Sequence, residues 1–202
     1  MNQKIMQKVS YGLFALTARE GEKDNGCIIN TVSQVASEPN TIAISVNKNN
    51  YTHDMIVDTG EFNVSILSES AKFDTFKHFG FQSGKNVDKF ASIGITRANN
   101  GIAVIQTKET NGYISGKVFQ EIDLGSHTLF IASVIDGEAF SDTPSATYSF
   151  YFSNIKPKIM EQKKVVKGWI CTICGYIYEG ETLPDDYFCP VCKHPASDFI
   201  PL

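Results

Sequence analysis

The sequence predicts a mainly β protein with short helices, in which a closed antiparallel barrel precedes a small metal-binding domain. Most of the first 157 residues divide into short β-branched segments separated by turn residues. Four of the five cysteines lie in the last 32 of 202 residues, as two Cys-x-x-Cys pairs. A Lys-rich run separates these two regions. We therefore expect one domain at 1–157, a linker at 158–168 and a second domain at 169–202.

The first half of the expected barrel alternates strands with two helices. β-branched and alternating segments predict strands at 8–18, 27–36, 41–46 and 62–67. Apolar residues at helical spacing predict helices at 51–58 and 70–79. Polar residues with Gly or Pro predict connections at 19–26, 37–40 and 80–88.

The second half, residues 93–152, reads almost entirely as strand. Turn signals are expected at 99–101, 111–112, 125 and 136–137, where Asn or Asp accompanies Gly or where Gly stands alone. The aromatic residues Tyr148, Phe150, Tyr151 and Phe152 alternate as in a strand and are expected in the core or at an interface. Many strands with few short helices favour the barrel.

Charge and composition narrow the function classes. The net charge of −4 disfavours a generic nucleic-acid binder. No apolar run approaches the ~20 residues of a membrane span, and the first twelve residues contain no apolar leader segment. We therefore expect a cytoplasmic protein with neither nucleic acid nor membrane as a partner. In a reducing compartment, paired Cys-x-x-Cys motifs indicate a metal site before they indicate disulfides.

The cysteine spacing predicts one four-thiolate metal centre. The predicted ligands are Cys171, Cys174, Cys189 and Cys192, as two pairs separated by fourteen residues. Two such loops can supply a tetrahedral sulfur site, which suits zinc or iron. A segment of about 34 residues cannot bury enough apolar surface to fold unaided, so metal binding would supply folding free energy. A structural zinc ribbon is the alternative at this point.

The segment CTICGYIYEGETLPDDYFCPVCKHPASDFIPL resembles rubredoxin along its whole length. The resemblance implies one iron held by the four cysteines, which transfers single electrons without changing its ligands. It also implies an aromatic core around the metal, formed by Trp169, Tyr176, Phe188 and Phe199. Lys193 stands where many rubredoxins have Gly, a position that tends to need a positive φ.

The N-terminal region carries no fingerprint of a dinucleotide or nucleotide fold. No two glycines are separated by a single residue, so Gly-x-Gly-x-x-Gly is absent, and there is no Walker loop. The residues alone indicate a β-rich domain that exchanges electrons with iron.

A resemblance extends this interpretation. The run NGCIINTVSQVASEPNTIAISVNKNNYTHDMI, with FNVSIL, FKHFGFQSGKNVDKF and IDLGSHTLFIASV, resembles the flavin reductase family, most closely its flavoredoxin-type members. This implies an FMN-binding split β-barrel and a homodimer. Its fusion to a rubredoxin domain is similar to the high-molecular-weight rubredoxins of anaerobes. The fusion implies electron transfer from NAD(P)H through FMN to iron and then to a partner protein, such as a diiron flavoprotein that reduces nitric oxide or oxygen.

The flavin reductase resemblance also assigns site residues. The segment facing the flavin ring corresponds to Cys27, Asn30, Thr31, Val32 and Ser33. The phosphate side corresponds to Lys48, Asn49, Asn50, Thr52, Ser83 and Lys85, where a helix N-terminus and cations favour an anion. His127 matches the histidine of the family's Gly-Asp-His motif near the nicotinamide, and Ser126 replaces the Asp. For Cys27, a buried apolar thiol is an equally good explanation, and for His127 a purely structural role stays open.

Three alternatives remain at this point. The chain could be a flavin reductase or ferric reductase that releases its reduced product. It could be a non-enzymatic carrier reduced by a separate reductase. It could also be a β-barrel binding module with a zinc ribbon, which would be colourless, whereas FMN is yellow and ferric rubredoxin is red.

Overall fold

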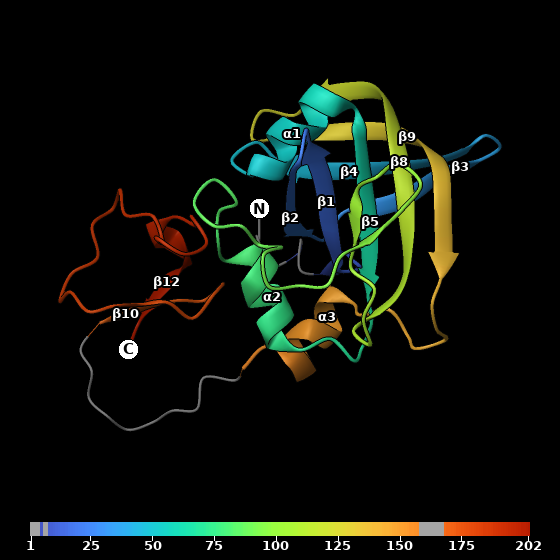
Figure 1. Cartoon of the computed structure of the whole chain (residues 1–202). Coiled ribbons are helices and arrows are strands. Elements are labelled where there is room, and N and C mark those ends of the chain that lie inside the picture. Colours follow the sequence, from blue (N-terminus) through green and yellow to red (C-terminus); the bar gives the residue numbers. More distant parts are fainter. Residues whose placement is uncertain (1–4, 6–7, 158–167) are drawn as a thin grey trace.

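The computed structural model describes residue 5 and residues 8–157 and 168–202 (Figure 1). Of the predicted linker at 158–168, only Gly168 is among the described residues. The strands of the N-terminal region are β1 (Phe14–Glu20), β2 (Lys23–Ile29), β3 (Val32–Ser37), β4 (Asn40–Asn47), β5 (Glu61–Leu67), β6 (Thr96–Arg97), β7 (Ala103–Val104), β8 (Thr110–Asp123) and β9 (His127–Ala139). Its helices are α1 (Tyr51–Thr59), α2 (Phe73–Gly80), α3 (Tyr148–Phe150) and the π-helical turn η2 (Tyr151–Ile155). Within these described residues, no helix is long and apolar enough to cross a membrane.

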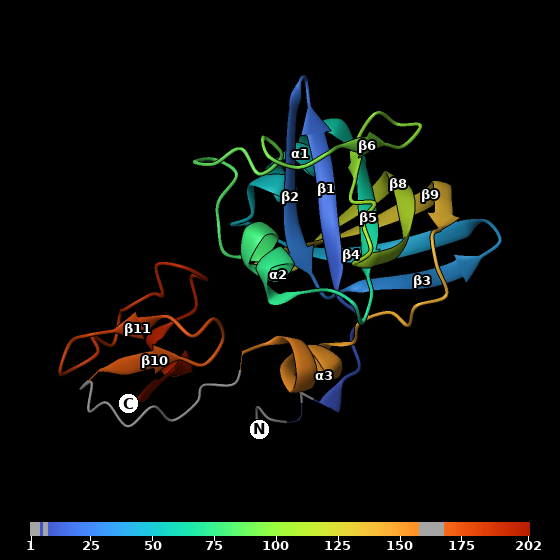
Figure 2. The ribbon, with the colours of Figure 1, turned by 60° about the horizontal axis from the view of Figure 1, so that its bottom comes forward.

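Seven of these strands form one antiparallel sheet in the order β2-β1-β5-β8-β9-β4-β3. The sheet curls around a common interior, as Figures 1 and 2 show. Its edges are β2 and β3, which are consecutive in sequence, so the barrel is split between them. The prediction of a mainly β protein with short helices and a split barrel is confirmed.

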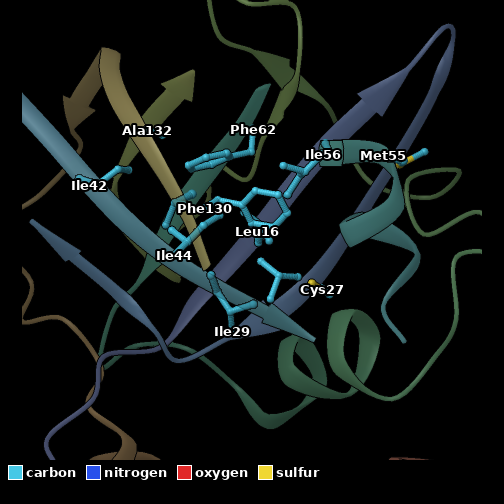
Figure 3. Packing of buried hydrophobic residues seen from close by; sticks show 13 residues of the cluster. Leu16, Cys27, Ile29, Ile42, Ile44, Met55, Ile56, Phe62, Phe130 and Ala132 are labelled. Atoms are coloured by element: carbon cyan, nitrogen blue, oxygen red, sulfur yellow. The ribbon is translucent and has the colours of Figure 1, made fainter. Parts of the chain in front are cut away.

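The interior of the barrel is filled by aliphatic and aromatic side chains from five strands and α1 (Figure 3). Alternation along β1 sends Leu16 inward to this cluster, where it meets Phe62 and Phe130. Met55 and Ile56 of α1 are also fully buried in the cluster. Helix α1 ends at Gly60, whose φ of 71° suits the left-handed residue that closes many helices.

Helix α2 covers the outer face of the same sheet. Ala15, next to Leu16 on β1, points to this side and packs with Phe79 of α2 and with Phe90. Strand β1 is therefore buried on both faces, which explains why the four consecutive residues from Ala15 to Ala18 are all buried instead of alternating.

Two predicted turns prove to lie inside strands. Gly112 belongs to β8 and Gly137 to β9, and the two strands pair across this region. A Cβ at Gly112 would come within 2.8 Å of the Glu138 carbonyl oxygen, and one at Gly137 within 2.9 Å of the Tyr113 carbonyl oxygen. These glycines permit close backbone approach within a sheet, so the prediction of turns at 111–112 and 136–137 was wrong.

The prediction of a strand at 148–152 was also wrong. Tyr148, Phe150, Tyr151 and Phe152 lie in helical turns instead of a strand. The Thr147 hydroxyl accepts a hydrogen bond from the Phe150 amide at 3.1 Å, which is an N-cap contact. The Tyr151 ring then packs on Phe76 of α2, with ring centroids 4.6 Å apart. Tertiary packing and the cap override the alternating pattern.

The hairpin that opens the barrel is tighter than expected. The polar stretch 19–26 was predicted to be a connection, but β2 already begins at Lys23, which pairs with Glu20 of β1. Gly21, with φ of 58°, makes the turn. The first strand begins at Phe14 rather than at residue 8.

The C-terminal residues form a separate small sheet. Its strands are β10 (Trp169–Cys171), β11 (Ile177–Tyr178) and β12 (Phe199–Pro201), in the order β11-β10-β12, with the short 3-10 turn η3 (Ala196–Asp198) before β12. The views in Figures 1 and 2 both place this module beside α2, away from the barrel sheet.

Candidate metal centre and flavin site

The four C-terminal cysteines lie in two loops of the same construction. In the first loop, the Gly175 amide donates to the Cys171 carbonyl at 2.8 Å. In the second, the Lys193 amide donates to the Cys189 carbonyl at 2.9 Å. Backbone amides also donate to the sulfurs of Cys171, Cys174 and Cys192. Both loops thus turn back on themselves and aim amide hydrogens at sulfur, as the spacing predicts.

The four sulfur atoms converge. All lie within 4.8 Å of one another. The Sγ atoms of Cys171 and Cys192 are 3.5 Å apart, as are those of Cys174 and Cys189. A disulfide needs about 2.05 Å, so these contacts are not disulfides. A tetrahedron with metal–sulfur bonds of about 2.3 Å has edges of roughly 3.8 Å, which this cluster matches.

The electrostatics of the cluster favour a cation. The hydrogen bond from Cys192 is the largest cause that lowers the pKa of Cys174, to about 5. Burial acts in the opposite direction but is outweighed. The pKa of Cys192 is correspondingly raised, first by its bond to Cys174 and then by burial. Burial also raises the pKa of Cys171. One ionised thiol therefore opposes ionisation of its neighbours, and a metal ion at the centre would remove that penalty.

An aromatic shell surrounds the cysteines. Trp169, Tyr176 and Phe199 pack against Cys171 and Cys189, as predicted. Phe188 does not, since it is 60% exposed. Tyr187 takes that place in the shell, with its ring 5.5 Å from Phe199 and 4.7 Å from Tyr178. Phe188 forms an isolated antiparallel bridge with Pro195. Its side chain points outward there and that of Tyr187 points inward, so the prediction for Phe188 was wrong by one residue. The residues fit iron, which when bound supplies a one-electron redox couple with all four positions filled.

On the barrel, several predicted flavin residues gather at the N-terminus of α1. The Lys85 ammonium lies 3.2 Å from the Asp54 carboxylate and 5.6 Å from the centre of the Tyr51 ring. The Lys23 ammonium lies 4.5 Å from the centre of the same ring. Two cations thus flank the start of a nine-residue helix, an arrangement suited to an anion. Burial opposes ionisation of Asp54, but bonds from His53 and Lys85 outweigh it and lower the pKa of Asp54.

A buried polar atom lies beside this cluster. The Asn25 amide nitrogen donates to the Thr52 hydroxyl at 3.0 Å, while its Oδ1 is buried without a hydrogen-bond partner among the described residues. A Cβ at Gly84 would come within 2.0 Å of that oxygen. Only glycine at position 84 therefore lets the 83–85 loop cross β2 this closely. The Gly84 backbone covers this buried acceptor. The two cations and the helix start beside it fit an anion such as a flavin phosphate.

The predicted ring-facing segment lies at the split of the barrel. Cys27 is buried on β2, and burial raises the pKa of its thiol, opposed by a bond with Thr52 and by the charge of Lys89. Asn30 and Thr31 link β2 to β3, with the Thr31 hydroxyl donating to the Asn30 side chain at 3.1 Å. Val32 and Ser33 begin β3, where Val32 packs on the core and Ser33 is exposed.

Lys48 and His127 lie together in a second location. The Lys48 ammonium is 2.6 Å from the Asp123 carboxylate, and its amide donates to the Ser126 carbonyl at 3.1 Å. The ring nitrogen Nδ1 of His127 is 2.9 Å from the Ser126 hydroxyl. Lys48 is therefore held at the β8–β9 turn instead of beside Lys85. Asn49 and Asn50 form the turn before α1, and the Asn47 side chain accepts from the Asn49 amide at 2.8 Å.

Four residues of this region were not singled out from the sequence: Lys23, Asn25, Tyr51 and Lys89. Lys23 and Asn25 were assigned to a polar connection, and only the strand register places them next to α1. Lys89 is almost wholly buried and donates to the carbonyls of Gly26 and Phe79 at 2.7 and 2.8 Å. Burial lowers the pKa of this ammonium. Nothing in the local sequence, a lysine between Asp88 and Phe90, predicts that this side chain is buried between β2 and α2.

A split barrel with a cationic helix start, joined to a four-thiolate metal centre, defines a two-cofactor redox protein. Comparison with known proteins agrees with this class. A model of the flavin reductase like domain matches residues 6–158, and a model of the rubrerythrin, rubredoxin-like domain matches residues 169–200. The chain therefore belongs to the flavin reductase-like family and carries a rubredoxin-like domain.

Individual relatives cover nearly the whole chain or a large part of it. A high molecular weight rubredoxin of Moorella thermoacetica is 32% identical over 95% of this chain and 96% of its own. A ferric-chelate reductase (NAD(P)H) of Archaeoglobus fulgidus is 33% identical over 75% of this chain and 89% of its own. The crystal structure of flavoredoxin from Methanosarcina acetivorans superposes with a TM-score of 0.57 at 22% identity, covering 64% of this chain and 68% of that one. The chain is thus a flavin reductase-like oxidoreductase with a rubredoxin-type metal centre.

Proposed function

We propose that this protein passes electrons from NAD(P)H through one FMN to the iron of its C-terminal domain, and from there to a partner protein. The observation that carries the proposal is the presence of a flavin reductase-like barrel and a four-thiolate centre in one chain. Bound FMN accepts a hydride and can give up the electrons one at a time, while a single iron accepts only one. The two centres together would convert a two-electron donor into a one-electron supply.

The residues at α1 have defined tasks in this proposal. Lys85 and Lys23 would hold the phosphate of FMN, together with Ser83, Asn50 and Thr52. Lys85 would then leave its ion pair with Asp54 and pair with the phosphate instead. FMN, not FAD, is proposed because the sequence has no dinucleotide fingerprint. The ring then lies along Cys27 and the 30–33 segment at the split of the barrel.

His127 is proposed to orient the nicotinamide. Its Nδ1 is engaged by Ser126 at 2.9 Å, so the other ring nitrogen is available for a hydrogen bond to the donor. Lys48 follows β4 and is held against the same turn by Asp123, where it supplies positive charge for a phosphate of NAD(P)H. The relative from Archaeoglobus fulgidus, whose name specifies NAD(P)H, supports this class of donor.

We further propose a cytoplasmic homodimer with domains at 1–157 and 169–202 and a linker at 158–168. The second copy would cover the exposed apolar side chains on the long β8–β9 hairpin, which include Phe119 at 60% and Leu124 at 55% exposure. The reduced cysteine cluster suits a reducing compartment.

The external partner is proposed to present a basic patch. Residues 169–202 carry a net charge of −4 before the metal is counted, and four thiolates around ferric or ferrous iron add −1 or −2. Such a surface associates faster with a basic partner at low salt. A diiron flavoprotein that reduces nitric oxide or oxygen fits the fusion of these two domains.

Anaerobic reduction of the purified protein with NADH tests the order of transfer. Flavin and iron absorbance are followed separately in the full chain and in a chain that ends at Pro157. We expect flavin bleaching in both, iron bleaching after flavin in the full chain, and loss of electron delivery to the protein acceptor in the short chain. Equal delivery by the short chain would remove the iron from the path. Failure of NADH to bleach the flavin would leave the carrier alternative, in which a separate reductase supplies the electrons.

Reduction of ferric chelates is a second candidate function. The 33% identity with a ferric-chelate reductase over 75% of this chain favours it. In that case the chain ending at Pro157 would reduce ferric chelates as fast as the full chain does, because the reaction would need only the flavin.

A further inference from the structure

The C-terminal module makes a specific polar contact with the barrel domain. Lys156 closes the η2 turn, and its ammonium lies 2.6 Å from the carbonyl oxygen of Thr172 and 2.6 Å from that of Ile173. These two residues are the ones between Cys171 and Cys174 in the first metal loop. One lysine of the barrel domain therefore holds the loop that carries half of the metal ligands.

The contact is supported from the barrel side. The Lys156 ammonium lies 4.9 Å from the centre of the Phe152 ring, one turn earlier. Its amide donates to the Tyr151 carbonyl at 2.7 Å, and the Tyr151 ring is buried against Phe76 of α2. The cation is thus fixed at the end of a packed helical turn instead of on a free side chain.

Helix α2 forms a second part of the same interface. A cleft of about 530 Å³ is lined by Val191 of the second metal loop and by five residues in and just after α2: Asp74, Lys77, His78, Phe81 and Gln82. On its other face, α2 packs against the barrel sheet through Phe79. The Lys89 ammonium joins the two elements, because it donates to the carbonyls of both Phe79 and Gly26 of β2. Helix α2 therefore lies between the metal module and the strand that carries Cys27.

The charges at this interface are complementary. Burial lowers the pKa of Lys156, and the thiolates of Cys171, Cys174 and Cys192 across the contact oppose that shift. The metal module is acidic and Lys156 faces it from the barrel domain, whereas Lys77 of α2 lines the cleft together with Asp74, whose carboxylate lies 3.9 Å from the Lys77 ammonium. A ferrous centre with four thiolates carries −2 and a ferric one −1, so a fixed cation stabilises the ferrous form more.

We propose that Lys156 is a positioning residue that docks the rubredoxin-like domain onto α2 and η2 and raises the reduction potential of its iron. The docked state is the one in which the iron receives electrons from the barrel side. The docking and the change in potential go beyond the proposed function, whereas the transfer of electrons from the barrel side in the docked state rests on it.

The test measures the midpoint potential of the iron in the full, flavin- and iron-loaded protein by spectroelectrochemistry. Lys156→Gln removes the charge and is expected to shift the potential to a lower value. Lys156→Arg keeps a charged donor and is expected to retain the potential. Lys117→Gln removes an exposed lysine of β8 and is the matched control, with no shift expected.

Hydrogen exchange of the same proteins supplies a readout that does not depend on redox chemistry. Peptides covering 171–176 and α2 are expected to exchange faster in Lys156→Gln than in the parent, and to be unchanged in Lys117→Gln. An unaltered iron potential in Lys156→Gln would overturn the proposal, and so would unaltered exchange in both peptides. Neither readout uses NADH, so failure here is distinct from failure of the proposed electron route.

Discussion

Gly175 and Lys193 occupy equivalent positions in the two metal loops. Each donates its amide to the carbonyl of the first cysteine of its loop, and their φ angles are 80° and 60°. Lys193 is the one non-Gly residue with positive φ among residues 5, 8–157 and 168–202. The expectation that this position needs a positive φ is confirmed, and the chain accepts the strain of a side chain there.

Lys193→Gly is expected to stabilise the metal domain. A non-Gly residue in the left-handed region costs on the order of 1 kcal/mol, and Gly removes that cost. Thermal loss of the ferric absorbance should shift to higher temperature. Gly175→Ala is the reciprocal variant and should shift it to lower temperature. Equal temperatures for all three proteins would contradict the interpretation.

Protein prepared with adequate iron is expected to contain one iron for each chain and to show ferric bands. The physical reason is the four-sulfur cluster with its aromatic shell. Cys174→Ser should reduce the iron content sharply, because it removes one of the four thiolates, whereas Cys27→Ser should leave it unchanged. Zinc alone, without visible bands, would make the C-terminal domain a structural zinc module.

Lys85→Glu is expected to weaken FMN binding several-fold or more. A charge-assisted hydrogen bond is worth roughly 1.5–3 kcal/mol, and the new carboxylate would also face Asp54. Fluorescence titration of the flavin-free protein measures the change. Lys117→Glu on β8 is the charge-matched control. The same affinity in Lys85→Glu and in the parent would show that the phosphate lies elsewhere.

Tyr151→Phe is expected to flatten the alkaline loss of stability. Burial, then the charges of Tyr148 and Cys174, raise the pKa of Tyr151 to about 12, whereas an unfolded tyrosine has a pKa of about 10. Between these values the unfolded chain loses the proton first, so the free energy of unfolding falls as pH rises. Denaturant titrations at pH 9 to 12 measure it. A slope equal to that of the parent would contradict the assignment.

Local patterns determined much of the fold. Helix α1 and strands β4 and β5 lie within about one residue of their predicted limits, because their periodicity agrees with their tertiary environment. The metal ligands were determined by spacing alone, since two Cys-x-x-Cys loops are self-contained and need only to face each other.

Other features depended on contacts distant in sequence. Lys23 and Lys85 are 62 positions apart and meet only because the β1–β2 hairpin and the 83–85 loop both reach Tyr51. The segment at 148–155 is helical because Thr147 caps it and Phe76 of α2 receives Tyr151. Lys156 reads as one lysine of a basic run, yet the packing of η2 places its ammonium on the first metal loop. Sequence periodicity reports which face of an element is apolar, whereas the identity of the partner across a contact is decided by how the elements pack.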